Sequence, residues 1–238
     1  MNRHGCDVTL FVRTLERYRA EHADRLPFLI DSPPANVFEL LDRLPSLEGE
    51  ALTTALHFVG DLKDRRAAPA LIELLESCDA AHAEPLAHVV ATIGGRRACP
   101  ALLRVLSRTD DPQRRWAALY ALTWLMDQRA FPALLGLFQA RDEPARLRAQ
   151  ATEALTYLLG DMPPGDVRWR AACEAFLIGL EDADVDVRFW CVYALGTMRA
   201  RAALPKLREL AAHDQSTLPT SGSSIRDEAA DAVRVIEG

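Results

Sequence analysis

The chain has 238 residues, of which 49% are hydrophobic and 26% are charged. Its net charge is −6, with a pI near 5.6. This composition supports a buried core and excludes a disordered chain. The acidic balance argues against broad binding to nucleic-acid phosphates. Sparse glycine (12 residues) and only 7% aromatic residues favour helix over sheet.

No segment predicts export or membrane insertion. The first 22 residues lack the apolar region and cleavage site of a secretory signal, and no apolar run approaches the ~18 residues that span a bilayer. No C-x-x-C pair occurs among the five cysteines, which are Cys6, Cys78, Cys99, Cys173 and Cys191. We therefore expect a cytoplasmic protein with reduced thiols and no zinc site.

The first 48 residues predict two degenerate helices that cap the N-terminal end. Residues 7–24 form one periodic segment, and residues 32–44 (SPPANVFELLDRL) form its partner. We expect a capping region at 1–48 and one continuous repeat domain at 49–238.

A helical hairpin recurs after the capping region. Its first helix is predicted at 52–62, 83–93, 115–125, 148–158, 188–198 and 226–236. Its second helix is predicted at 68–75, 99–106, 131–138, 173–180 and 204–210. Proline suits the first turn of a helix, where its missing N–H breaks no hydrogen bond, and four second helices begin with Pro69, Pro100, Pro132 and Pro205. Insertions at 160–168 and 213–224 explain the longer spacings.

These hairpins predict an all-α fold. Each hairpin carries more apolar positions than it can bury alone, and stacked neighbours would cover them. The pattern D-x-x-V-R-x-x-A-A-x-A-L-G…A-x-P-x-L-x-x-L-L resembles the HEAT-repeat family, in particular the short HEAT-like repeats of phycobilisome (PBS) lyases. The match is clearest from Asp184 to Gly196 and in the proline-led helices. The resemblance implies a right-handed α-solenoid (superhelix) of about six antiparallel helix pairs.

Arginine recurs in the first turn of four of the first helices, as Arg115, Arg148, Arg188 and Arg226. A cation there opposes the helix dipole, so another interaction must offset the cost. We expect partners among preceding acidic residues, such as Asp111, Asp142 and Asp184, or among the carbonyls of a neighbouring repeat. In the resembled family this arginine is structural, which implies the same role here; the alternative is a clamp on a substrate phosphate.

No motif predicts a catalytic residue, a cofactor or a metal site. The patterns G-x-S-x-G, H-E-x-x-H and Walker A do not occur. Gly94-Gly95-Arg96-Arg97 is expected to be a turn, because it lacks the lysine–serine pair of a phosphate loop. His57 and His88 share one repeat column, but a metal between them would require both to lean inward.

The outer faces of the first helices carry aromatic residues. Trp116, Tyr120 and Trp124 lie at i, i+4 and i+8 on one side of a helix, and Ala117 is expected to face outward beside them. The whole predicted outer patch is Trp116, Tyr120, Trp124, Tyr157, Phe189, Trp190 and Tyr193. The rings either pack on one another or under the 160–168 insertion, or they form an exposed site for a partner or a second copy.

The second helices are expected to line the inner, concave wall. Its predicted groove residues are Glu73, Arg104, Arg108, Ala133, Gly136, Ala140, Ile178 and Asp182. Ala133, Gly136 and Ala140 would let a partner helix or peptide lie close to the backbone. Arg104 and Arg108 could then pair with its carboxylates. In the alternative, the glycine is merely tolerated in a surface helix.

We therefore expect a non-enzymatic HEAT-like repeat protein of a bacterial-type cytosol that binds another protein or peptide as a scaffold, adaptor or inhibitor of the immunity type. Neither a cofactor nor a membrane is expected, nucleic acid is disfavoured, and a homodimer is left open. The alternative is an enzyme, either an accessory lyase of the bilin-lyase type or a HEAT-like DNA glycosylase. A glycosylase would need a basic channel with aromatic residues and a carboxylate facing it.

Overall fold

The structure is a computed structural model that describes residues 8–160 and 162–238. Cys6 and the start of the predicted capping region lie outside these ranges. The described residues form 14 α-helices and contain no strand beyond one isolated bridge between Thr217 and Ser224. The predicted all-α class is confirmed. The chain divides after Leu125 into two compact units, so a single continuous domain over 49–238 stays a prediction.

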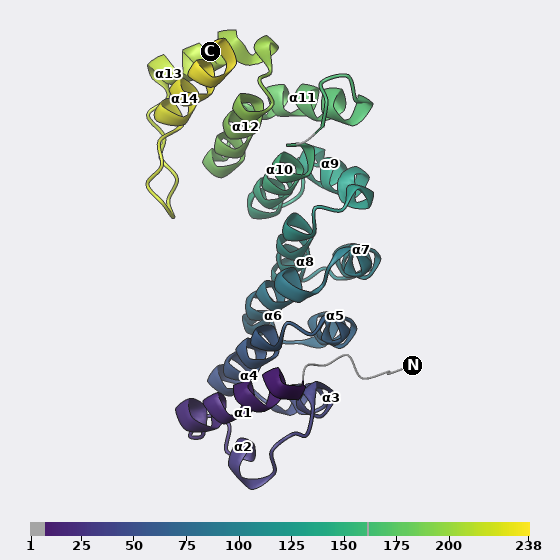
Figure 1. Cartoon of the computed structure of the whole chain (residues 1–238). Coiled ribbons are helices and arrows are strands. Elements are labelled where there is room, and N and C mark those ends of the chain that lie inside the picture. Colours follow the sequence, from purple (N-terminus) through teal and green to yellow (C-terminus); the bar gives the residue numbers. More distant parts are fainter. Residues whose placement is uncertain (1–7, 161) are drawn as a thin grey trace. The chain divides into compact units, whose positions relative to one another are not determined.

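The first unit stacks its helices in two layers (Figure 1). Its α-helices are α1 (Val8–His22), α2 (Phe28–Asp31), α3 (Val37–Leu41), α4 (Gly49–Leu62), α5 (Ala68–Ser77), α6 (Ala80–Ile93), α7 (Cys99–Arg108) and α8 (Pro112–Leu125). The short 3-10 helices η1 (Leu44–Ser46), η2 (Arg65–Ala67) and η3 (Arg96–Ala98) connect them. Helices α4, α6 and α8 form one layer, while α5 and α7 lie side by side in the other.

Helix α1 packs against α4 through aromatic side chains. The rings of Tyr18 and Phe58 stack with their centroids 4.6 Å apart, and both side chains are buried. The hydroxyl of Tyr18 donates to Asp61 Oδ2 at 2.9 Å, which satisfies its polar end. Helix α1 lies within the predicted segment 7–24. The predicted partner at 32–44 is shorter, because the chain there is divided between α3 and η1.

The second unit repeats the same arrangement. Its α-helices are α9 (Phe131–Gln139), α10 (Ala145–Leu159), α11 (Val167–Gly179), α12 (Val185–Thr197), α13 (Leu204–His213) and α14 (Ile225–Glu237). The 3-10 helices η4 (Gln128–Ala130) and η5 (Arg201–Ala203) precede α9 and α13. Helices α10, α12 and α14 form one layer, and α9, α11 and α13 each pack against the following helix of that layer (Figure 1).

Helix α11 begins six residues before the predicted start at 173. Asp166 caps it by accepting a hydrogen bond from the backbone N–H of Arg168 at 2.8 Å, so Val167 is already helical. At its other end, Gly179 permits a close approach. A Cβ added there would lie 2.4 Å from Cys191 Sγ and 2.8 Å from Phe138 Cζ. Because α11 starts at Val167, the last two residues of the predicted 160–168 insertion are helical.

The described cysteines, which are Cys78, Cys99, Cys173 and Cys191, are buried free thiols. No described helix is both long enough and apolar enough to cross a membrane. The described ranges also hold no group of three or more histidine, cysteine, aspartate or glutamate side chains placed to bind a metal.

Candidate binding site

The turns that lead into the second helices contain a recurring aspartate–arginine pair. In the turn after α4, Asp64 Oδ1 accepts a hydrogen bond from the backbone N–H of Arg66 at 3.0 Å. The Arg66 guanidinium donates back to the same carboxylate, from Nε to Oδ1 at 2.9 Å and from Nη2 to Oδ2 at 2.7 Å. This two-pronged geometry is the strong form of the arginine–carboxylate interaction.

The same D-x-R pairing occurs twice in the second unit, joining Asp127 to Arg129 and Asp166 to Arg168. Hydrogen bonds from the Arg168 side chain and backbone lower the pKa of Asp166 to about 2. An intramolecular carboxylate therefore neutralises each of these arginines. The pairing stabilises the turn, and the ion pair as a whole carries no net charge that could attract a ligand.

The turn after α6 departs from this pattern. Gly95 occupies the aspartate position, with φ 59° and ψ 175°, a backbone conformation that favours glycine. Arg97 therefore has no carboxylate two residues before it. Within the described part of the chain, its side chain forms no hydrogen bond or ion pair.

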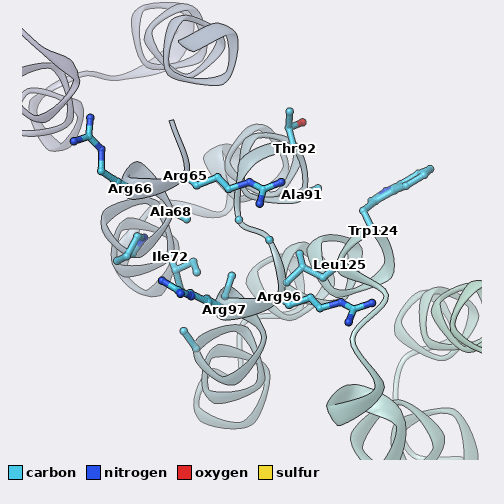
Figure 2. Close-up of a pocket in the computed structure, with 15 residues that line it drawn as sticks. Arg65, Arg66, Ala68, Ile72, Ala91, Thr92, Arg96, Arg97, Trp124 and Leu125 are labelled. Atoms are coloured by element: carbon cyan, nitrogen blue, oxygen red, sulfur yellow. The ribbon is translucent and has the colours of Figure 1, made fainter. Parts of the chain in front are cut away.

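The turns η2 and η3 border a cavity of about 950 Å³ in the first unit (Figure 2). Its lining residues are Arg65, Arg66, Ala68, Pro69, Ile72, Ala91, Thr92, Gly94, Gly95, Arg96, Arg97, Ala98, Ala101, Trp124 and Leu125. We call this cavity the arginine pocket. The lining combines four guanidinium groups, one indole and small or apolar side chains.

The four arginines of the pocket point in two directions. Figure 2 shows the side chains of Arg65 and Arg96 extending to one side, while those of Arg66 and Arg97 extend to the other. Arg66 is neutralised by Asp64, and its Cζ lies 5.2 Å from the centroid of the Phe38 ring. The side chain of Arg65, like that of Arg97, forms no hydrogen bond or ion pair with any described residue. Positive charge therefore remains at both sides of the pocket.

The lining contains no carboxylate, imidazole or thiol. Arginine stays protonated at any physiological pH, so it cannot act as an ordinary general base. The arrangement therefore suits the binding of an anion better than proton transfer. Sequence reasoning missed this site because the turn motif resembles no phosphate loop. The available signal was the arginine pair at the same position of two successive repeats, at residues 65–66 and 96–97.

The predicted aromatic patch forms one cluster in each unit. In the first unit, ring centroids lie 5.3 Å apart for Trp116 and Tyr120 and 6.2 Å apart for Tyr120 and Trp124. His88 meets Tyr120 edge-on at 4.5 Å. Trp124 is 49% exposed and lines the arginine pocket. Ala117, predicted to face outward, is fully buried.

In the second unit, Trp190 lies at the centre of the other cluster. Its centroid is 6.5 Å from Tyr157, 5.8 Å from Phe189 and 5.7 Å from Tyr193. Ring-on-ring packing thus occurs in both units, as the first interpretation of the patch expects. Tyr157 still exposes 37% of its surface, and a role of either cluster in binding stays a prediction.

Six of the eight predicted groove residues are exposed. Glu73, Arg104 and Arg108 are exposed on α5 and α7 of the first unit. In the second unit, Ala133, Gly136 and Ile178 are exposed and Ala140 is half-buried. Asp182 is only 3% exposed, so its predicted place on an open groove is wrong.

Two arginines pair with the buried carboxylate of Asp182 and offset the cost of its burial. Arg148 Nη2 donates to Asp182 Oδ1 at 3.2 Å, and Nη1 of both Arg148 and Arg141 donates to Oδ2. The expected partner of Arg148 was Asp142, which precedes its own helix. The observed partner instead follows α11, the helix after the one that carries Arg148.

Arg188 uses the same kind of partner. Its Nε lies 3.4 Å from Asp214 Oδ2, and its Nη1 donates to the carbonyl of Asp182 at 2.9 Å. Asp184, its expected partner, instead caps α12 by accepting from the backbone N–H of Asp186 and of Val187, each at 3.1 Å.

The remaining members of the arginine column differ. Arg226 Nη2 donates to the carbonyl of Ala212 at 3.4 Å. Asp111 caps α8 by accepting from the backbone N–H of Gln113 at 2.9 Å. Near Arg115, Arg114 Nη1 reaches the carbonyl of Glu76 at 3.0 Å and ties α8 to the end of α5.

Comparisons with known proteins agree on the type of repeat. Residues 68–156 match the family of HEAT repeats, and residues 187–213 match the PBS lyase HEAT-like repeat. Comparison with curated proteins gave no match.

Solved structures show the same helical-repeat fold. The complex of CpcE and CpcF of phycocyanin lyase from Nostoc sp. has a TM-score of 0.55 and 21% identity, covering 71% of this chain and 99% of that one. A designed armadillo repeat protein in complex with the peptide (KR)4 has a TM-score of 0.53 and 15% identity, covering 83% and 98%. An engineered protein has a TM-score of 0.52 and 20% identity, covering 84% and 96%.

Proposed function

Because the chain belongs to the HEAT-repeat family, with repeats of the PBS lyase HEAT-like type, we propose that it is a non-enzymatic module that binds a protein partner. In this role it acts as a scaffold, adaptor or inhibitor. Binding centres on the arginine pocket of the first unit.

One observation carries this proposal. The pocket presents four arginines, while its lining offers no carboxylate, imidazole or thiol. Arginine at a desolvated protein surface is a frequent anchor of protein–protein recognition, and its fork matches a partner's carboxylate. Trp124 at the pocket adds a half-exposed aromatic surface of the kind enriched at interfaces.

Two groove arginines extend the basic surface beyond the pocket. Ala101 lines the pocket, and Arg104 and Arg108 follow it at i+3 and i+7 on α7, on the same helix face. Both are exposed. We assign them to the outer part of the binding surface. Ala133, Gly136, Ala140 and Ile178 form a second candidate surface in the other unit.

One solved structure of similar fold holds a peptide. The designed armadillo repeat protein of similar fold is in complex with the peptide (KR)4. We propose by analogy that the partner presents a short charged segment to this chain. The pocket of the protein described here is lined by arginines, so its partner would be acidic, whereas the designed protein's peptide is basic.

A lyase activity is the second candidate. The repeat at residues 187–213 and the likeness to the CpcE–CpcF complex favour it. It requires groups that move protons near a bound chromophore, and the pocket lining supplies none. A purified protein that carries a visible chromophore would favour a lyase, and one that cleaves alkylated DNA would establish a glycosylase.

The proposal is tested by affinity capture from native lysate, followed by rebinding of the purified captured protein. Arg65→Glu/Arg97→Glu should abolish rebinding. The matched control is Arg13→Glu/Arg19→Glu on α1, which changes the net charge equally away from the pocket. Two further double variants, Arg104→Glu/Arg108→Glu and Trp116→Ala/Trp124→Ala, map the surface around it. Rebinding that survives in the pocket variant would refute the pocket as the partner site.

A further inference from the structure

We infer that the arginine pocket binds an acidic peptide segment, one carboxylate of which takes at Arg97 the place that Asp64 takes at Arg66. This inference rests on the proposed function and names the chemistry of its partner. It depends on two equivalent turns of the first unit. The turn after α4 contains Asp64, whereas the turn after α6 has Gly95 at the same position.

The occupied turn shows how such a carboxylate is held. Asp64 engages Nε and Nη2 of Arg66 at 2.9 and 2.7 Å, and the same donors of Arg129 and Arg168 bind their own aspartates. Three of the described turns thus satisfy the arginine internally. At Arg97 the donors are the same, but the chain provides no acceptor in the described ranges. A ligand carboxylate completes this fourth turn.

The missing side chain also leaves space for the ligand. A Cβ built on Gly95 would meet nothing nearer than the Arg65 side chain, whose Nη1 lies 3.8 Å away. Arg65 therefore reaches across the turn that lacks its aspartate. Its side chain points away from that of Arg97 in Figure 2, so the two guanidinium groups serve separate carboxylates of one segment.

The rest of the lining suits the part of the bound peptide that lies between its two carboxylates. Ile72, Ala101 and Leu125 give the pocket apolar walls, and Trp124 is half-exposed beside them. Such walls suit the backbone and small side chains of an extended peptide. We therefore assign a segment with alternating acidic and small residues.

The charge distribution favours a peptide over a nucleic acid. The whole chain has a net charge of −6, and Asp64 neutralises one of the four pocket arginines. A nucleic acid carries a phosphate at every nucleotide and needs a continuous row of unpaired cations. Exposed Glu73 interrupts such a row on α5, in the repeat position that Arg104 occupies on α7.

Fluorescence anisotropy with a labelled octapeptide of alternating glutamate and alanine tests the inference. The 238-residue protein should bind it saturably, and more weakly as NaCl rises from about 50 to about 500 mM, because salt screens the charges. An octapeptide of alternating glutamine and alanine should not bind. Arg97→Gln should weaken binding at least about tenfold, since charged hydrogen bonds contribute that much. Arg65→Gln should also weaken it, whereas Arg13→Gln should change it less than about twofold.

Several results would overturn the inference. They are the absence of binding, equal binding of the glutamine peptide, an unchanged affinity in Arg97→Gln, or tighter binding of an octathymidylate than of the acidic peptide. Arg97 is exposed, and its side chain forms no hydrogen bond or ion pair with any described residue, so circular dichroism should show an unchanged melting temperature for Arg97→Gln. If the captured protein still depends on the pocket while the acidic peptide fails, the proposed function stands and only the acidic segment is refuted.

Discussion

Arg148 and Asp182 form a buried ion pair across 34 residues of sequence. Their side chains are 9% and 1% exposed, and Asp182 Oδ1 also accepts from the backbone N–H of Asp184 at 3.0 Å. The pair joins the first turn of α10 to the loop between α11 and α12. Because both side chains are buried, water cannot take the place of either partner.

Removing one partner should destabilise the second unit. Asp182→Ala leaves the guanidinium of Arg148 buried without its carboxylate, which typically costs about 3–5 kcal/mol of the free energy of unfolding. Urea unfolding measured by circular dichroism checks this value. The matched control is Asp231→Ala, which breaks the exposed pair with Arg234 and should cost less than about 1 kcal/mol. Equal effects of the two substitutions would contradict the assigned role of Asp182.

The same pair makes stability depend on acid pH. Burial raises the pKa of Asp182, but hydrogen bonds from Arg148 and the Asp184 backbone outweigh it and hold the pKa below its usual value. A carboxyl with a depressed pKa stabilises the fold fully above its unfolded pKa, near 3.9, and loses that contribution as pH falls through its folded pKa. We therefore expect the melting temperature to fall below about pH 4.

Asp182→Asn isolates this contribution. Glu153, Asp186 and Glu228 have pKa values raised by burial, so their protonation changes stability in the opposite direction. The quantity to measure is the difference in melting temperature between the wild type and Asp182→Asn, from about pH 7 to about pH 2.5. It should shrink as the pH falls; a constant difference would show that protonation of Asp182 is not involved.

Two glycines of the second unit should respond oppositely to alanine. At Gly179 a Cβ would lie 2.4 Å from Cys191 Sγ, so Gly179→Ala should destabilise by about 1–3 kcal/mol through overpacking. At Gly136, within α9, a Cβ meets nothing within 4 Å. Gly136→Ala should therefore stabilise by up to about 1 kcal/mol through helix propensity. Differential scanning calorimetry distinguishes the two, and a stabilised Gly179→Ala would show that α11 and α12 are not so closely packed.

Releasing Arg66 from Asp64 should strengthen binding to the pocket. Asp64→Ala removes the internal acceptor of Arg66 and the cap on its backbone N–H, at an expected cost of about 1 kcal/mol in stability. The freed guanidinium should raise the affinity for the acidic octapeptide severalfold, as anisotropy would show. Asp127→Ala makes the equivalent change outside the pocket and should leave the affinity unaltered.

The sequence alone predicted the helices whose starts depend on residues close together in the chain. Pro69, Pro100, Pro132 and Pro205 each lie in the first turn of a second helix, as predicted. Helix periodicity and the missing proline N–H act within a few residues, so they can be read without knowing the neighbours. The family and the all-α fold followed from these repeated local signals.

Tertiary structure decided which side chains meet. Asp182 shares a helix-face spacing with exposed residues, yet the chain folds it onto Arg148, which no local pattern specifies. The glycine at position 95 is visible in the sequence as a departure from Asp64 and Asp127. Its meaning appeared only once those aspartates were seen to bind the arginines two residues later. Hydrogen bonds and burial depend on distances in space, and the spacing of residues along the chain does not set those distances.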